Sequence, residues 1–213
     1  RGKSSVVRLI AAGLRQGGLK TYAKTTGTSP RIINEKGQDK YIHRLRSASI
    51  GEQISLIRFF SKLNPDVLVI ECMAVNPQYQ WVSEQKIVQS TIGVLTNVRP
   101  DHLDEMGINL DQITKSMANT IPFNGIMVTS EEKKLNILES ISNKRNTKLY
   151  ITNSKCKKKY LDNFNYLEHR ENISLSLKVC ELCGVSKDIA LEGMSNCIPD
   201  PGALTIWNIR FNK

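Results

Sequence analysis

Two short apolar runs, each followed by polar or acidic residues, constrain the fold of this 213-residue chain more than any other feature. Val67–Ile70 is a continuous run of aliphatic, mostly β-branched residues that ends at Glu71. Ser90–Leu95 repeats the pattern and leads into Asn97 and the pair Asp101-His102. Such runs are typical of strands buried on both faces in a parallel sheet. Because ligands of open α/β sheets bind beyond the carboxyl ends of the strands, we expect these polar residues to lie at one site.

The rest of the chain alternates helical and strand patterns. Apolar spacing predicts helices over 6–14, 52–63, 113–120, 133–142, 171–184 and 186–194, the last after a Ser186 cap, and strands over 19–23, 126–129 and 148–151. This alternation predicts an α/β fold, a doubly wound and mostly parallel sheet. We expect residues 1–198 to form one nucleotide-binding domain, and residues 199–213 to form a linker and the start of a further domain.

The chain opens on the sequence Arg1-Gly2-Lys3-Ser4-Ser5, directly before a helical pattern. Gly-Lys-Ser supplies the last positions of the phosphate-binding loop G-x-x-x-x-G-K-[ST], whose backbone N–H groups, lysine and hydroxyl hold phosphates and Mg²⁺. We therefore expect Gly2, Lys3, Ser4 and Ser5 to bind a nucleotide. Because Arg1 stands where an initiator methionine would, and no strand precedes the loop, we expect the sequence to be a fragment that lacks the start of the motif.

A strand-end carboxylate, a loop hydroxyl and a histidine on the next strand's exit loop can together place Mg²⁺ near a γ-phosphate. Ser4 and Glu71 are the predicted ligands, and His102 indicates a second metal position because imidazole is unusual for Mg²⁺. Lys3, Glu71 and His102 are the predicted catalytic residues. Structural alternatives remain: Glu71 can cap a strand end or pair with a basic side chain, His102 can be a surface residue, and Asp101 and Asp104 can be cap and turn residues.

The formal charge of +10 invites a nucleic-acid interpretation, which its distribution disfavours. The one dense basic run, Lys155–Tyr160, follows a predicted strand and is typical of a solvated loop. We therefore expect no nucleic-acid partner. A polyanionic substrate or product, ATP or an anionic membrane surface would each be attracted by this charge.

Five cysteines without a signal peptide indicate free thiols in a reducing compartment, so we expect a cytoplasmic location. Cys180 and Cys183 have zinc-knuckle spacing, but no second C-x-x-C pair accompanies them and the surrounding pattern is helical, so we expect no metal there. No apolar run approaches the ~20 residues that span a bilayer. We expect the full-length protein to associate with a membrane through other parts.

The order of these motifs resembles the central ATPase domain of the Mur ligase family. The resemblance lies in N-x-x-x-D-H-L-D over residues 97–104 after a buried strand, in the earlier Gly-Lys-Ser and in the strand-end glutamate. Residues 70–81, 99–107 and 199–203 resemble, more narrowly, the ligase subunits of poly-γ-glutamate synthases. The likeness extends over the whole chain.

This resemblance implies an ATP-dependent amide ligase that forms γ-glutamyl bonds through an acyl phosphate. The implied cofactors are ATP and Mg²⁺, and the implied partners are glutamate, the growing poly-γ-glutamate chain and the membrane subunits of a synthase and export complex. By position, Lys3 and Ser4 match the family's phosphate lysine and Mg²⁺ hydroxyl, and Glu71 and His102 match its metal-binding acid and histidine. Asn172 matches an asparagine that contacts the adenine.

Residues 25–30 also resemble the T-S-P loop of folylpolyglutamate synthases, although a hydroxyl-rich turn explains them equally well. Many Mur ligases carry a modified lysine downstream of the D-H pair, where this chain has Ser116-Met117-Ala118-Asn119 with Lys115 nearest. The sequence therefore does not decide whether a second metal site exists.

We expect the family's C-terminal domain to lie beyond Lys213. Because an acyl phosphate hydrolyses unless water is excluded, the isolated 213 residues should bind ATP weakly and form little or no polymer. The alternatives are another Mur-like ligase, acting on cell-wall precursors or folate, and a P-loop nucleotide-binding or nucleic-acid-binding protein without ligase activity.

Overall fold

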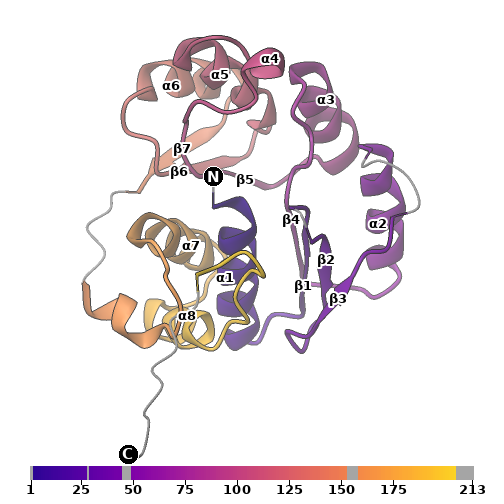
Figure 1. The fold of residues 1–213 in the computed structure, drawn as a ribbon, viewed down its shortest axis with the longest axis vertical. Coiled ribbons are helices and arrows are strands. Elements are labelled where there is room, and N and C mark those ends of the chain that lie inside the picture. The colour runs from indigo at the N-terminus through magenta and orange to yellow at the C-terminus, as the bar shows by residue number, and fades with distance from the viewer. Residues whose placement is uncertain (1, 28, 45–48, 153–157, 205–213) are drawn as a thin grey trace, which may run out of the picture.

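The computed structural model describes residues 2–27, 29–44, 49–152 and 158–204, which form an α/β fold (Figure 1). Its strands lie in two hydrogen-bonded sheets. The first has the order β3-β2-β1-β4 and comprises β1 (Thr21–Thr25), β2 (Arg31–Ile33), β3 (Asp39–Tyr41) and β4 (Val67–Ile70). The second has the order β5-β6-β7 and comprises β5 (Ile92–Leu95), β6 (Ile126–Thr129) and β7 (Lys148–Ile151).

The sheets are mostly parallel, as predicted. β1 pairs in parallel with β4, and β6 pairs in parallel with both β5 and β7. The antiparallel additions are β2 and β3, which extend the first sheet from β1. The sequence did not predict this hairpin, because strands of three residues are too short for an alternating pattern to be read.

The helices agree with the predicted segments to within a few residues and add short ones. They are α1 (Lys3–Gln16), α2 (Gly51–Ser61), α3 (Pro77–Val82), α4 (Leu103–Met106), α5 (Leu110–Met117), α6 (Leu135–Lys144), α7 (Arg170–Leu182) and α8 (Lys187–Ser195). A π-helix, Ser83–Val88, continues α3, and 3₁₀ turns occupy Ala118–Thr120 and Lys158–Asn163. Ser186 is the N-cap residue of α8, as predicted, although its side chain makes no capping hydrogen bond.

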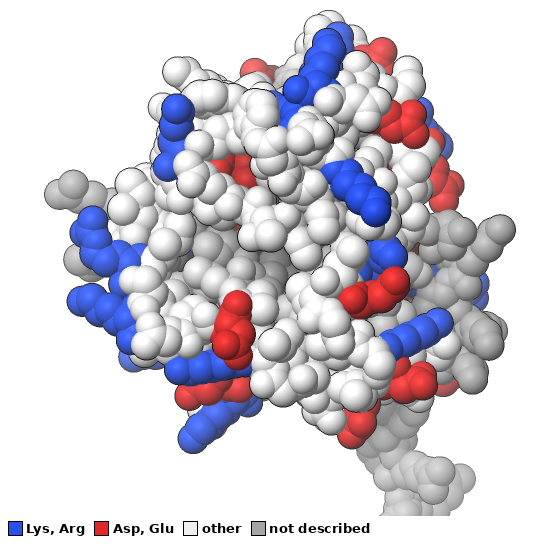
Figure 2. Space-filling view, turned by 180° about the vertical axis from the view of Figure 1, so that it is seen from behind, with Lys and Arg blue, Asp and Glu red and all other residues white. Residues whose placement is uncertain are grey.

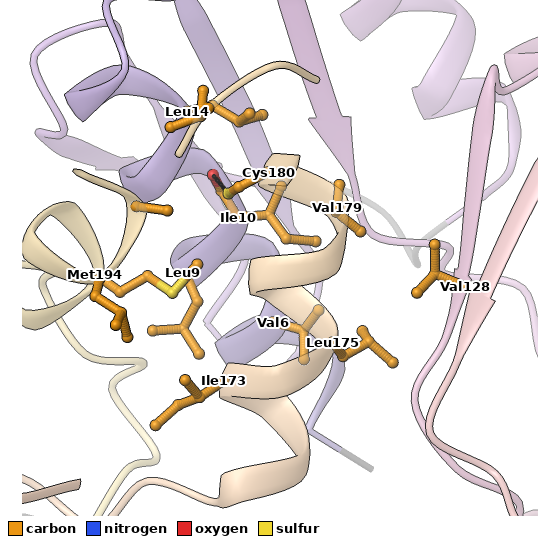
Figure 3. Packing of buried hydrophobic residues seen from close by; sticks show 13 residues of the cluster. Val6, Leu9, Ile10, Leu14, Val128, Ile173, Leu175, Val179, Cys180 and Met194 are labelled. Carbon is orange, nitrogen blue, oxygen red and sulfur yellow. Dashed lines mark hydrogen bonds between the residues drawn. The ribbon is translucent and has the colours of Figure 1, made fainter. Parts of the chain in front are cut away.

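The largest core lies between α1, α7 and α8 and the strands that they cover (Figure 3). Its fully or nearly fully buried members include Leu9 and Leu14 of α1, Val128 of β6 and Leu175 of α7. Val69 of β4 and strand β5 also pack against this cluster, so one helical layer covers both sheets.

Separate clusters cover the opposite faces. Ile113 of α5 and Leu138 of α6 pack on the second sheet, and Leu56 and Phe60 of α2 pack with Tyr22 of the first. Helices therefore lie on both sides of the strands, which is the doubly wound arrangement.

The cysteines within the described part of the chain are free thiols. Cys180 is buried in the main core, and burial raises the pKa of its thiol to about 12. Residues 155–157 of the basic run lie outside the described residues, so its assignment to a solvated loop stays a prediction. No described helix is both long enough and apolar enough to cross a membrane.

Candidate active site

A cavity of about 290 Å³ opens beyond the carboxyl ends of β1, β4 and β5. Its wall brings together segments that are far apart in the sequence: the start of α1 and the residues that follow each of these strands. Among them are Lys3, Thr26, Gly27, Glu71, Asn97 and His102. The expectation that the strand-end residues share one site is thus met by the geometry.

Glu71 lies at the inner edge of this cavity and is only 5% exposed. Its Oε2 accepts hydrogen bonds from Ser4 Oγ at 2.9 Å and from the backbone N–H of Thr26 at 2.8 Å. Both of these hydrogen bonds use Oε2 of the carboxylate and not Oε1. A hydroxyl and a carboxylate in contact supply the hard oxygen atoms that Mg²⁺ prefers.

The backbone of Glu71 is fixed from two sides. Its N–H donates to the carbonyl of Lys24 at 2.9 Å, which extends the pairing of β1 and β4 beyond the last paired residues. Its carbonyl accepts from Nε2 of the buried Gln53 of α2 at 3.2 Å. The carboxylate is therefore carried on a rigid strand end.

Thr26 and Gly27, from the segment 25–30, line the cavity. Thr26 binds Glu71 through its backbone N–H, not through its hydroxyl. A Cβ atom built on Gly27 would lie 3.6 Å from Ser4 Oγ, so Gly27 packs close to Ser4. Thr28 lies outside the described residues.

The start of α1 provides the other side of the site. Gly2 adopts a left-handed conformation with φ of 77°, and its carbonyl accepts from the N–H of Val6 at 3.0 Å. Lys3 is exposed and lines the cavity, while Ser5 is partly buried in the same turn. The unpaired N–H groups of a helix start, together with a lysine, form a favourable site for phosphate groups.

Asn172 of α7 lies against Gly2. A Cβ atom on Gly2 would come within 2.9 Å of Asn172 Oδ1, while Nδ2 of Asn172 donates to Glu168 Oε1 at 2.7 Å. Burial raises the pKa of Glu168, against the opposing effect of its hydrogen bonds. The structure therefore places Asn172 beside the start of α1 and not among the residues that line the cavity.

The exit of β5 supplies His102. This residue has φ of 46° and ψ of 51° and directly precedes α4. Its imidazole is 55% exposed, and Nε2 lies 3.7 Å from Asp101 Oδ1. In the described part of the chain no three His, Cys, Asp or Glu side chains are grouped as a metal site, so His102 shares the cavity with Glu71 without forming such a cluster.

Sequence reasoning missed two charged residues near this site. Arg44 lines the cavity. Glu131, which directly follows Ser130 after β6, is buried and accepts from the N–H of Val98 at 2.7 Å, so it holds the loop that carries Asn97 and His102. In the segment 115–119, Met117 contributes to the cavity wall and Lys115 is exposed.

Residues 1–197 match the family of Mur ligase middle domains. The chain belongs to the Mur ligase family. It is 39% identical over 211 residues to the capsule biosynthesis protein CapB of Bacillus anthracis, and the matched region covers 97% of this chain and 45% of that protein. It is 40% identical over 209 residues to the PGA synthase CapB of Bacillus subtilis (strain 168), covering 97% of this chain and 53% of that protein. The chain thus spans about half the length of these curated relatives.

Solved structures confirm the fold. E. coli FolC in complex with DHPP and ADP superimposes with a TM-score of 0.69 over 98% of this chain and 57% of FolC. With 15% identity, this likeness shows a shared architecture. The Mur ligase fold that the motifs predicted is therefore the fold of this chain.

Proposed function

We propose that this chain is the nucleotide-binding part of an ATP-dependent amide ligase that forms γ-glutamyl bonds in poly-γ-glutamate. One observation carries the proposal: Lys3 at the start of α1, Glu71 and His102 line a single cavity, and Ser4 Oγ donates to the carboxylate of Glu71. The identity of 39–40% to two CapB proteins over 97% of the chain supports the substrate assignment. FolC, which has the same fold, binds ADP.

The proposed reaction has two transfers. A carboxylate oxygen of glutamate or of the polymer attacks the γ-phosphorus of ATP, and ADP leaves. The amine of the next glutamate then attacks the acyl carbon of the resulting acyl phosphate and loses a proton, while inorganic phosphate leaves. The start of α1 and Lys3 would hold the β- and γ-phosphates during the first transfer.

Mg²⁺ fits the residues present, because it binds few protein oxygens and retains water ligands. Ser4 and Glu71 would hold it, and the ion, when bound, neutralises the charge of the phosphate groups. His102 is the proposed ligand of a second cation on the same cavity wall. Gly2 and Ser5 would contact the phosphates, and Asn172, which packs beside Gly2, would contact the adenine.

The net charge of +10 suits a polyanionic product. On the face seen in Figure 2, Lys and Arg side chains alternate with Asp and Glu and do not gather into one continuous patch. Among the described residues, this face therefore lacks the clustered basic residues that are typical of a nucleic-acid surface. Membrane subunits of a synthase complex, and a cytoplasmic location beside them, are part of the same proposal.

The test is the release of ADP and phosphate by the full-length protein with ATP, Mg²⁺ and glutamate or a γ-linked oligomer. Glu71→Gln and His102→Ala should abolish glutamate-dependent turnover, with a loss of about 10²-fold or more for Glu71→Gln. The matched control is Glu139→Gln, an exposed position of α6, which should behave as wild type. Hydroxylamine should convert the acyl phosphate into a glutamyl hydroxamate.

Turnover that is indifferent to glutamate would contradict the proposal. It would point instead to another Mur-like substrate or to a nucleotide-binding protein without ligase chemistry.

A further inference from the structure

Three charged residues from separate segments form a connected group beside the cavity. Arg44, which follows β3, donates from Nε to Glu52 Oε2 at 2.7 Å and from Nη2 to Glu52 Oε1 at 2.9 Å. Glu52 belongs to the first turn of α2. Nζ of Lys24, a fully buried residue of β1, lies 3.4 Å from Glu52 Oε1.

This group consists of one acidic and two basic side chains. Hydrogen bonds from Arg44 lower the pKa of Glu52, and the same hydrogen bonds raise the pKa of Arg44, so both are ionised at neutral pH. Burial lowers the pKa of Lys24, while the charge of Glu52 opposes this effect. Glu52 thus fixes Arg44 through two hydrogen bonds, while the buried Lys24 holds Glu52 from the other side.

Arg44 is also the member of the group that reaches the cavity. It lines the same wall as Lys3 and Glu71, and its side chain is 20% exposed. Among the described residues, none accepts a hydrogen bond from its Nη1. The two bonds to Glu52 fix the guanidinium plane through Nε and Nη2, and Nη1 takes part in neither bond.

We propose that Arg44 binds a carboxylate of the acidic substrate that does not react, namely the α-carboxylate of the residue whose γ-carboxyl group is activated. This inference rests on the proposed function. In a γ-linked glutamate chain every residue keeps its α-carboxylate, so a fixed cation beside the reacting group would select this polymer. Arginine suits the role because its planar donors match carboxylate geometry. Glu52 and Lys24 act through Arg44 as positioning residues.

The experiment compares two γ-linked glutamate oligomers as acyl donors for the full-length protein. They differ only at the terminal residue, which carries a free α-carboxylate in one and an α-amide in the other. Wild type should prefer the free acid by about 10-fold or more in kcat/KM, because a charged hydrogen-bond partner is lost in the amide.

Arg44→Gln should lower kcat/KM for the acid, leave the amide nearly unchanged and so remove the preference, while ATP affinity stays as in wild type. Arg44→Lys keeps the positive charge but lacks the planar pair of guanidinium donors, so it should restore part of the preference for the free acid. If Arg44→Gln lowers the folded fraction of the protein, the preference for the free acid is measured on Arg44→Lys instead. The matched control is Arg58→Gln, an exposed arginine of α2, which should retain the full preference.

Each contrary result has its own meaning. Three results would overturn the role of Arg44 while the ligase assignment stands. They are an equal loss of kcat/KM for both acyl donors, an unchanged preference for the free acid in both Arg44 variants, and weaker ATP binding by these variants. A wild-type protein without any glutamate-dependent turnover would overturn the proposed function, and this inference with it.

Discussion

Gly2 and Asn172 meet at the first turn of α1, where backbone conformation and side-chain packing act on the same residue. Gly2 has φ of +77°, and a Cβ atom there would lie 2.9 Å from Asn172 Oδ1. Gly184 has a similar φ of +83° but nothing within 4 Å of the equivalent atom. A substitution at Gly184 therefore measures the free-energy cost of the left-handed backbone alone, and one at Gly2 measures that cost together with the cost of a steric clash.

Gly184→Ala should destabilise the protein by about 1–2 kcal/mol, the cost of placing an L-residue in the left-handed region. Gly2→Ala should cost more and should weaken ATP binding, because Asn172 must move. The free energy of unfolding in urea and the dissociation constant of an ATP analogue measure both effects. If Asn172→Ala does not reduce the penalty of Gly2→Ala, the contact has no energetic role.

The residues at the site differ in how readily a sequence pattern identifies them. Glu71 could be predicted because it directly follows a buried apolar run. Glu131 lies just beyond β6 in a similar position, and the same pattern could have identified it. Arg44 has no such signal, because it follows a strand of three residues and owes its place to a contact with Glu52, eight positions away.

At the scale of elements, the exit of β6 holds the exit of β5. Thr129 Oγ1 donates to the carbonyl of Leu95 at 2.9 Å, and Ser130 Oγ donates to the carbonyl of Thr96. Glu131 then accepts from the N–H of Val98 at 2.7 Å through Oε2, and through Oε1 from the N–H groups of the two residues after Glu132, at 2.8 and 3.2 Å. Three consecutive side chains thus fix the loop that leads to His102.

Glu131→Ala should lower the free energy of unfolding by about 2–3 kcal/mol, because it leaves the buried N–H of Val98 without a partner. It should also reduce glutamate-dependent turnover, since the loop that carries His102 loses its anchor. Thermal unfolding and steady-state rates of the full-length protein test both. Glu132→Ala, at an exposed neighbouring position, is the control, and equal effects in the two variants would contradict the assigned anchor.

Helices and buried strands could be predicted element by element, but their grouping could not. Periodicity identified α1, α7 and β4 because each has a continuous apolar face or run. The division into two sheets depends on which strand edges form hydrogen bonds, and the π-helix Ser83–Val88 has no local pattern of its own. These features arise from tertiary packing, which a single sequence does not display.

At the scale of the whole molecule, Arg8 joins the first half of α1 to the segment that follows α8. It lies on α1 one turn beyond Ser4 and is 2% exposed. Its Nη2 contacts Asp39 Oδ2 of β3 at 2.8 Å, its Nη1 donates to the carbonyl of Ile198 at 3.3 Å, and its Nε lies 3.8 Å from Asp200 Oδ2. One buried cation therefore ties α1, the β2-β3 hairpin and residues 198–200 together.

Arg8→Met should destabilise the protein by about 2–4 kcal/mol, because removing one partner of a buried ion pair leaves the other charges uncompensated. Asp39 and Asp200 retain exposures of 19% and 28%, so water relieves part of the penalty and the lower end is expected. The control is Arg31→Met: Arg31 also reaches Asp39, at 4.0 Å, but is 27% exposed and should cost under about 1 kcal/mol. Adding Asp39→Asn to Arg8→Met should restore stability. If Arg8→Met unfolds at the wild-type urea concentration, this cation does not hold the three segments together.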